Sequence, residues 1–424
     1  MIAISFFLGF EHPEVTINTK KFLKQTFKKF DLTKEIAQNI STISPLETYK
    51  IAQVLNEKED IKSEFIEIKA NSFSLFEKKI ISIPKNLRTA KLDVFSSDEK
   101  SEIKVYLRNG TLIENNKVKV LKNLPNNFIF GHQNGGLITY FTTNKYSFAY
   151  LTQKKDDCYY VSVINLTLDK SILDSKCLPD PNKVDFNGTG GAYFKNDKTL
   201  LLGIGAPERD SEKIGNLAQI EDSIFGKFLV FDPKDLDNDN NNFKIFSLGH
   251  RNPQGIIYKN NNYYSIEHGP RGGDEINKIE YLGNYGWPKI SYGTKYIKAT
   301  KEGLDNPQHA YREFDSIPNH YEPVFTFLPA IAPSDIINCP QNLEKYYPKN
   351  MCLMALTLRA QSIIIILFDD TGSKVVSVEK IKLNKRLRHF GRNSLGELYV
   401  DRENQFFISS DNDGIYSIYF DKFW

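Results

Sequence analysis

Short β-type runs recur over most of this chain, and they restrict the possible folds more than any other feature. From about Ser63 onward, apolar or alternating stretches rich in Ile, Val, Tyr and Phe are divided by Asn, Gly, Asp and Pro. Such runs favour strands and the separators favour turns. The runs are 103–107, 118–121, 137–141, 147–151, 159–164, 200–204, 228–231, 363–368, 406–409 and 415–420.

The number of these runs predicts an all-β architecture. Many short antiparallel strands over roughly 300 residues fit a pair of sandwiches, a large barrel or a propeller. No regular helices lie between the runs, which argues against a doubly wound parallel sheet. No exact repeat is visible, so periodicity alone does not choose among the three architectures.

The first 62 residues have a different pattern. Apolar residues recur at three- and four-residue spacing from Phe22 to Phe30 and from Ile36 to Val54, which predicts two or three amphipathic helices. We therefore expect a helical segment over 1–62 and a β domain over 63–424. The apolar run 2–10 is shorter than the ~20 residues of a membrane span, and it fits either the remnant of a signal or anchor or the buried start of a helix.

Charge argues against a nucleic-acid partner. Lys and Arg number 55 against 52 Asp and Glu, and the two signs are mixed along the chain. No extended basic surface is therefore expected. Membrane association would depend on a short or missing N-terminal anchor, and nothing indicates an oligomeric state.

The four cysteines fall into two close pairs, Cys158 with Cys177 and Cys339 with Cys352. Two short-range disulfides fit this spacing, and they would indicate a periplasmic or extracellular location. Four buried free thiols in a cytosolic protein are the alternative, because Cys is often a core residue.

Side chains suited to a polar ligand are concentrated between residues 249 and 288. Arg251 offers a planar, permanently charged fork, while Asn252 and Gln254 offer paired donors and acceptors. This set suits an anionic, oxygen-rich ligand. A structural turn held by side-chain hydrogen bonds is the alternative.

The loop 267–275 has the oxygen atoms that a hard cation requires. Gly269 and Pro270 can turn carbonyl oxygens inward, and Asp274 and Glu275 supply carboxylates, which favours calcium. The histidines at 250 and 268 do not form a zinc-like set with the cysteines and are interpreted as hydrogen-bonding residues. The acidic stretch 232–242 lacks the glycine and terminal glutamate of an EF-hand and is predicted to be a solvated loop.

The phrases GHRNPQG, EHGPRGGDEIN and NYGWP, in this order, resemble the glucose/sorbosone dehydrogenase family, the soluble aldose sugar dehydrogenases that use pyrroloquinoline quinone. The resemblance covers roughly residues 85–424. It implies a six-bladed β-propeller, with quinone and sugar at the mouth of the central channel. Arg251, Asn252 and Gln254 would lie beside the quinone, with Arg359 as a further basic contact.

The resemblance also implies two calcium positions. The carbonyls of Gly269 and Pro270 would hold an ion that clamps the quinone. Glu275 and the backbone of Tyr285 would hold a second, structural ion.

The chain departs from the family at the general base, a histidine that removes the proton of the anomeric hydroxyl while hydride passes to the quinone. Asn187 or Gly188 takes its place, and the stretch 133–249 contains no histidine. Neither residue accepts a proton usefully at neutral pH. His132 would belong to an earlier blade. No catalytic residue is therefore assigned.

A second departure concerns the Arg-x-Arg pair of the family, which meets the quinone before the last blade. Arg386 and Arg388 have the right spacing, but an alignment of the final strands without a gap places Ser394 and Gly396 at those positions. The sequence thus supports two functions: a quinone-dependent aldose dehydrogenase of weak or lost activity, or a non-catalytic propeller that binds a carbohydrate or a protein.

Overall fold

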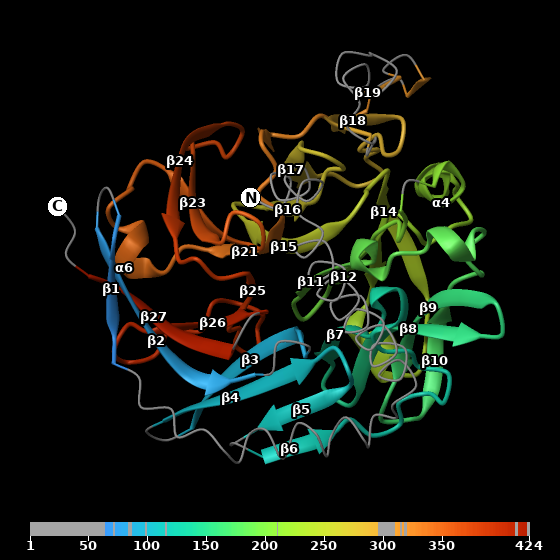
Figure 1. Cartoon of the computed structure of the whole chain (residues 1–424), viewed down its shortest axis with the longest axis horizontal. Coiled ribbons are helices and arrows are strands. Elements are labelled where there is room, and N and C mark those ends of the chain that lie inside the picture. The colour runs from blue at the N-terminus through green and yellow to red at the C-terminus, as the bar shows by residue number, and fades with distance from the viewer. Residues whose placement is uncertain are drawn as a thin grey trace, which may run out of the picture.

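Antiparallel sheets follow one another around a central axis in the computed structural model, and together they form a six-bladed β-propeller (Figure 1). The structure describes residues 64–421, apart from 71–72, 84–86, 98–99, 115–116, 210, 296–309, 314–315, 318–319 and 412–413. The helices predicted over 1–62 lie outside the described residues. Of the three architectures that fit the strand pattern, the propeller is the one observed.

The first three blades are each four-stranded and follow the order of the chain. Blade 1 consists of β3 (Thr89–Ser97), β4 (Lys100–Leu107), β5 (Thr111–Glu114) and β6 (Lys117–Val120). Blade 2 consists of β7 (Leu137–Thr142), β8 (Ser147–Lys155), β9 (Cys158–Asn165) and β10 (Lys170–Asp174). Blade 3 consists of β11 (Gly190–Lys195), β12 (Leu200–Ile204), β13 (Lys227–Phe231) and β14 (Phe243–Leu248).

The remaining blades continue around the axis. Blade 4 consists of β15 (Pro253–Lys259), β16 (Asn262–Glu267), β17 (Asp274–Ile279) and β20 (Phe325–Phe327), and a separate pair, β18 (Ile290–Thr294) and β19 (Ala310–Arg312), precedes β20 in the chain. Blade 5 consists of β21 (Pro333–Asn338), β22 (Met351–Thr357), β23 (Ser362–Phe368) and β24 (Val375–Lys382). Blade 6 consists of β25 (Leu387–Phe390), β26 (Phe406–Ser410), β27 (Gly414–Asp421), β2 (Ser74–Ser82) and β1 (Ile66–Lys69).

In the described part of the chain, helices are short and lie in the connections. The α-helices are α4 (Glu212–Gly215), α5 (Pro233–Asp237) and α6 (Gln341–Glu344). The 3₁₀ turns are η1 (His132–Asn134), η2 (Pro181–Lys183), η3 (Phe186–Gly188) and η4 (Asn216–Gln219). The acidic stretch 232–242 therefore is not a plain loop, because the Asp232 carboxylate accepts a hydrogen bond from Lys234 N and caps α5. The described helices include no segment with the length and hydrophobicity needed to cross a membrane.

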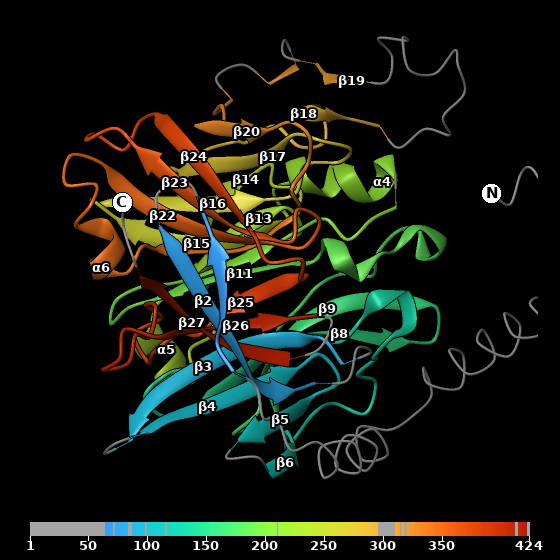
Figure 2. The ribbon, with the colours of Figure 1, turned by 60° about the vertical axis from the view of Figure 1, so that its left-hand side comes forward.

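Blade 6 joins the two ends of the described chain. Strand β2 pairs with β27 from Ser74 opposite Asp421 to Ser82 opposite Gly414. Figure 2 shows these segments side by side, blue against red. This pairing closes the ring, because one blade is built from strands of both ends of the described chain.

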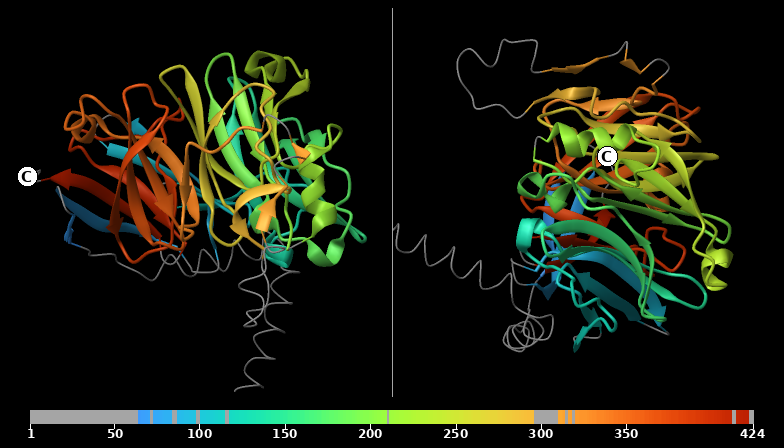
Figure 3. Two further views of the ribbon diagram at one scale, coloured as in Figure 1. Left: turned by 90° about the horizontal axis from the view of Figure 1, so that it is seen from above. Right: turned by 90° about the vertical axis from the view of Figure 1, so that its right-hand side faces the viewer.

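The hydrophobic core lies between neighbouring blades. Side chains such as Ile266 of blade 4, Leu353 and Ile364 of blade 5 and Phe406 of blade 6 belong to one buried cluster. Strand β22 is buried along its whole length. The blades stand next to one another in the views from above and from the side (Figure 3). Burial at these faces stabilises each blade against its neighbours at about 25 cal/mol per Å² of apolar surface.

The first strand of each blade is the innermost, and together these strands line the axis. Residues that lie one to three positions before four of these strands line one pocket, namely Arg88, Asn187, Arg251 and Ala332. We call this end of the axis the entry mouth. The opposite end, where the inner strands finish, is the exit mouth. A loop at residues 391–400 lies there.

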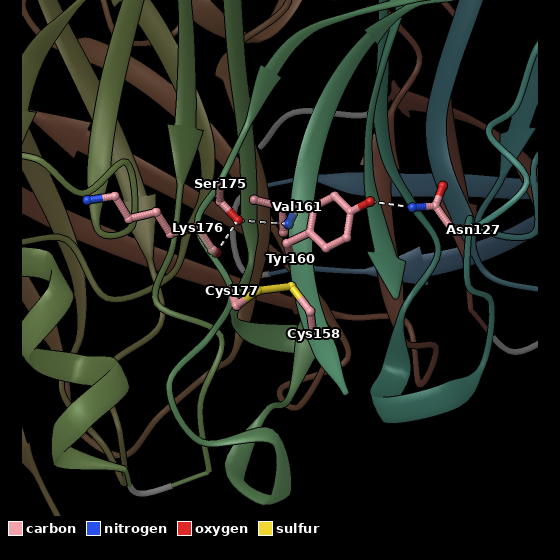
Figure 4. Close-up of a disulfide and its surroundings, with 7 residues drawn as sticks. All are labelled: Asn127, Cys158, Tyr160, Val161, Ser175, Lys176 and Cys177. Carbon is pink, nitrogen blue, oxygen red and sulfur yellow. Dashed lines mark hydrogen bonds between the residues drawn. A yellow bond between two sulfur atoms is a disulfide. The ribbon is translucent and has the colours of Figure 1, made fainter. Parts of the chain in front are cut away.

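Both cysteine pairs form disulfides, which confirms the predicted pairing and makes the free-thiol alternative wrong. Cys158, at the start of β9, is joined to Cys177 beyond β10, with a Cα–Cα distance of 5.1 Å (Figure 4). Cys339, after β21, is joined to Cys352 in β22, with a Cα–Cα distance of 5.5 Å. Each bridge therefore fixes a connection within one blade.

Candidate ligand-binding site

A pocket of about 600 Å³ opens at the entry mouth. It draws on residues that are far apart in the sequence, because the segments that precede the inner strands meet there. All six residues that the sequence predicts for cofactor binding line it: Arg251, Asn252, Gln254, Gly269, Pro270 and Arg359. The structure thus brings these residues together in one cavity of a size that suits a small organic ligand.

Arg251 is held in place by bonds from its backbone and its side chain. Its N–H donates to the Glu267 carboxylate at 3.1 Å, and its Nη1 donates to the carbonyls of His268 at 3.2 Å and Gly269 at 2.9 Å. The guanidinium lies over the Trp287 ring, 5.2 Å from the centroid. The buried Nε has no hydrogen-bond partner among the described residues. Arg251 is therefore a positioned cation whose buried Nε–H is left unused.

A buried histidine–glutamate pair supports this arginine. His250 Nδ1 lies 3.0 Å from Glu267 Oε1, and its Nε2 lies 2.9 Å from Ser247 Oγ. Burial opposes ionisation of Glu267, but His250 and two hydrogen-bond donors hold the pKa of this carboxyl below its usual value. The sequence interpretation of His250 as a hydrogen-bonding residue agrees with this geometry.

The amide of Asn252 ties three segments together. Its Oδ1 accepts hydrogen bonds from Gly190 N at 3.0 Å and from Gln254 Nε2 at 2.7 Å. Its Nδ2 donates to the Asn187 carbonyl at 3.1 Å. Asn252 therefore links the start of β11 to the start of β15 and fixes the shape of the pocket wall, which is also what the structural-turn alternative expects.

His268 lines the pocket, but both of its ring nitrogens are engaged. Its Nε2 donates to the Pro333 carbonyl at 2.5 Å, and its Nδ1 lies 3.3 Å from Asn252 Nδ2. Burial is the main cause that lowers the pKa of His268, which keeps the imidazole neutral. As predicted from the sequence, this residue serves in hydrogen bonding.

Asn187 and Gly188, at the position of the absent base, do line the pocket. Asn187 Oδ1 accepts a hydrogen bond from Arg88 Nη1 at 3.2 Å. A Cβ added at Gly188 would lie 3.0 Å from the Ala206 carbonyl oxygen. His132 instead contacts the Tyr159 hydroxyl and is not among the lining residues.

The gap-free alignment near the C-terminus is wrong. Arg386 and Arg388 line the entry-mouth pocket, whereas Ser394 and Gly396 line cavities around the loop at the exit mouth. The long connection between β25 and β26, which contains this loop, separates the arginines from Ser394 and Gly396. A gap-free count of residues back from the last strands ends within this connection and therefore stops short of the arginines.

The predicted calcium ligands are found in two places. Gly269 and Pro270 line the pocket, and the Gly269 carbonyl already accepts a hydrogen bond from Arg251. Glu275 and Tyr285 are not among the lining residues. Within the described ranges, no group of three His, Cys, Asp or Glu side chains is arranged to hold a metal.

Oxygen acceptors gather around Glu275. Burial and then the neighbouring Glu267 raise the pKa of Glu275 to about 8. Asn277 Nδ2 donates to both carboxylates, at 2.6 Å to Glu267 and at 3.2 Å to Glu275. Its Oδ1 is buried and has no hydrogen-bond partner in the described part of the chain. The region around Glu275 therefore has more hydrogen-bond acceptors than donors.

Further charged residues line the pocket outside the motifs, and sequence reasoning missed them: Arg88, Asp185, Glu208 and Arg209. Arg88 directly precedes β3, much as Arg251 and Asn252 precede β15. This equivalent position before the first strand of a blade could have revealed Arg88, but only once the blade boundaries were known.

Comparison with known proteins places this geometry in a family. The family model for glucose/sorbosone dehydrogenase matches residues 94–406. Aldose sugar dehydrogenase YliI of Escherichia coli is 30% identical over 195 residues, which cover 43% of this chain and 49% of that protein. An uncharacterized protein of Synechocystis is 28% identical over 232 residues, which cover 50% of this chain and 53% of that protein. The chain thus aligns with about half the length of these curated relatives.

Solved structures show the same fold. The apo form of the soluble aldose sugar dehydrogenase of Escherichia coli superposes with a TM-score of 0.60 at 19% identity, covering 81% of this chain and 99% of that one. A pyrroloquinoline-quinone-bound aldose sugar dehydrogenase of Streptomyces coelicolor gives a TM-score of 0.52 at 16% identity, covering 85% of this chain and 99% of that one. Because the family model spans most of the propeller, this chain belongs to the glucose/sorbosone dehydrogenase family.

Proposed function

We propose that the entry mouth binds pyrroloquinoline quinone and a sugar, and that oxidation of the sugar is weak or lost. The observation that carries the proposal is the convergence of the six predicted residues in one pocket around Arg251. Family membership and a relative named as an aldose sugar dehydrogenase support it.

The pocket residues fit a quinone that carries carboxylates and carbonyls. Arg251 keeps an unpaired buried Nε, and Arg359 and Arg386 add permanently charged groups to the lining. When bound, the quinone would supply the hydride acceptor. The protein's part is to hold it with guanidinium groups, while the hydrogen bonds of Asn252 keep the wall in place.

Calcium fits better at Glu275 than at Gly269. A cation would balance the acceptors around Glu275 and would favour ionisation of a carboxyl whose pKa is raised. The Gly269 carbonyl already faces the Arg251 guanidinium, so a cation there would lie close to another cation. We therefore propose Glu275 and the Tyr285 backbone as ligands of a structural calcium, and Gly269 and Pro270 as a weaker clamp position.

The absence of a histidine at the position of the family's base sets the expected rate. Asn187 and Gly188 provide no base, and His268 uses both ring nitrogens. General-base catalysis typically contributes about 10²- to 10⁴-fold in rate. A non-catalytic propeller that binds a carbohydrate or a protein is therefore the second candidate function. The two disulfides support an exported location for either.

A quinone titration followed by absorbance tests binding. We expect saturable binding that weakens by about 10- to 100-fold in Arg251→Ala, because a charge-assisted bond contributes about 1.5–3 kcal/mol. Arg402→Ala, an exposed arginine that does not line the pocket, is the matched control. Repeating the titration with a calcium chelator tests whether quinone binding depends on calcium. Wild-type protein that shows no saturable binding would contradict the proposal.

Dye reduction with aldoses tests turnover separately. With quinone and calcium supplied, we expect little signal from glucose-like sugars. Robust turnover would show that another group replaces the base, and the weak-activity part of the proposal would then be wrong.

A further inference from the structure

We propose that the entry mouth contains an anion subsite, formed by Arg88, Asn187 and Arg386 with Arg108 behind them, which selects a sugar that carries a carboxylate or a phosphate. The inference rests on the proposed function only in that the ligand is a sugar. It assigns a role to arginines that lie outside the phrases GHRNPQG, EHGPRGGDEIN and NYGWP.

Two of these residues meet across the pocket. Arg88 precedes β3 of blade 1, and Asn187 lies in η3, before β11 of blade 3. Arg88 Nη1 donates to Asn187 Oδ1 at 3.2 Å, and both residues line the pocket. The position where the family resemblance expects a proton acceptor is therefore an amide held by a guanidinium.

Arg108 lies behind this contact. Its Nη2 donates to the Asn134 carbonyl at 2.6 Å, and Asn134 Nδ2 donates to Asp185 Oδ1 at 2.9 Å. Asp185 Oδ1 in turn accepts from Asn187 N at 3.0 Å. This chain of hydrogen bonds fixes Arg108 and Asn187 relative to each other.

Positive charge exceeds negative charge in this wall. Asp411 is paired with Arg388 by two bonds of 2.5 Å, and Arg386 lies 4.0 Å from it. Asp185 lies 3.3 Å from Arg209. Within the described ranges, the hydrogen bonds of the Arg88 and Arg108 guanidiniums go to neutral oxygens.

Burial and neighbouring positive charges disfavour the protonated form of both Arg88 and Arg108. Burial and then Arg388 lower the pKa of Arg88, and burial, Arg388 and Arg88 lower the pKa of Arg108 to about 9. An anion in the pocket would favour the charged form of each arginine. The planar fork of Arg88 matches carboxylate or phosphate oxygens. A neutral sugar carries no negative charge to stabilise the two guanidiniums.

A binding experiment with three sugars tests the subsite. Glucuronate, glucose 6-phosphate and glucose are titrated calorimetrically into the full chain, with and without quinone. We expect at least one anionic sugar to bind about tenfold or more tightly than glucose, and to weaken as salt is added. The two anions separate a carboxylate from a phosphate preference.

Variants of Arg88 assign the effect. Arg88→Gln should weaken binding of the anionic sugar by about 10- to 100-fold more than it weakens binding of glucose, whereas Arg88→Lys should restore part of the affinity for the anion. Arg402→Gln is the control for loss of one exposed positive charge. Arg88→Lys also keeps the test valid if Arg88→Gln melts at a lower temperature.

A failure of the anion subsite can be distinguished from a failure of the proposed function. Equal affinity for all three sugars, or unchanged anion binding in Arg88→Gln, would overturn the subsite even if quinone binds. Competition by inorganic phosphate as strong as that of the sugar anions would show a general anion site and overturn the sugar assignment. Anionic-sugar binding without any quinone binding would support the subsite and contradict the proposed function.

Discussion

At the scale of single residues, Gly188 offers a direct test of the missing base. Its backbone is outside the left-handed region, so a side chain can be accommodated if the Ala206 carbonyl, 3.0 Å from the new Cβ, moves by a few tenths of an ångström. We predict that Gly188→His raises quinone-dependent oxidation of aldoses, by up to about 10²- to 10⁴-fold if the imidazole reaches the hydroxyl. Dye reduction measures the rate.

Gly188→Gln is the matched control, since it adds similar bulk without a base at neutral pH. A rate that rises equally in both variants would show that shape, and not proton transfer, limits turnover. The rate of Gly188→His should also rise with pH as the imidazole loses its proton, and a flat profile would count against its role as a base.

His389 makes stability depend on pH. Burial and then Arg388 lower its pKa to about 3, from an ordinary value of 6.5. Between these values the unfolded chain binds more protons than the folded one, so the free energy of unfolding should rise with pH in this window. One such group contributes at most about 1.4 kcal/mol per pH unit.

Chemical denaturation at pH values from 4 to 7, on wild type and His389→Gln, measures this contribution. We expect the variant to lose part of the slope below pH 6.5 and to have a similar slope above it. Parallel curves over the whole range would contradict the assignment of the pH dependence to His389.

Most residues that sequence reasoning placed in the pocket belong to short recognisable phrases of the sequence. Arg251, Asn252 and Gln254 stand in a single recognisable phrase, so their chemistry could be interpreted before any fold was known. Arg88 reaches the pocket only because blade 1 lies across the axis from blade 4. Arg386 was misplaced because the length of the connection between β25 and β26 cannot be determined from the sequence.

At the scale of elements, the positions of the strands were more predictable than the pairing between them. Every run singled out in the sequence coincides with a strand, and only the run 118–121 extends one residue beyond it. Alternating β-branched and aromatic residues between turn residues favour strands over other structures. The pairing of β2 with β27 could not be predicted, since no local signal links segments more than 300 residues apart. Likewise, α5 was missed because its cap is a single side chain within a polar stretch.

The loop at the exit mouth depends on one ion pair. Arg392 Nη2 donates to Asp335 Oδ1 at 2.5 Å, and its Nη1 donates to the Gly396 carbonyl at 2.7 Å. The Asp335 carboxylate is buried and also accepts from Phe390 N at 2.9 Å. The pair therefore joins β21 to β25 and to the loop that follows it.

We predict that Arg392→Met lowers the free energy of unfolding by about 3–5 kcal/mol, because it leaves the buried carboxylate of Asp335 without its cation. Denaturant unfolding measures this. Lys170→Met, which breaks the exposed pair with Asp239, should cost less than about 1 kcal/mol. Equal effects of the two variants would show that the inner ion pair is not the source of stability.

At the scale of the whole molecule, closure of the ring makes blade 6 critical for all blades. Strands from both ends of the described chain form this blade, and Leu75 of β2 lies opposite Phe420 of β27. Leu75 is fully buried in the cluster that extends through blades 4 and 5. A loss of packing there should therefore weaken contacts well beyond one sheet.

We predict that Leu75→Ala lowers the free energy of unfolding by about 2–5 kcal/mol, the cost of a buried cavity of this kind. Val376→Ala, at a side chain of β24 that is 56% exposed, is the control and should change stability by about 0.5 kcal/mol or less. Unfolding is followed by near-UV and far-UV circular dichroism together. If closure couples the blades, both probes shift by the same amount in Leu75→Ala and remain coincident. A separate early transition, with the other blades unaffected, would mean that blade 6 unfolds on its own and that the ring does not act as one cooperative unit.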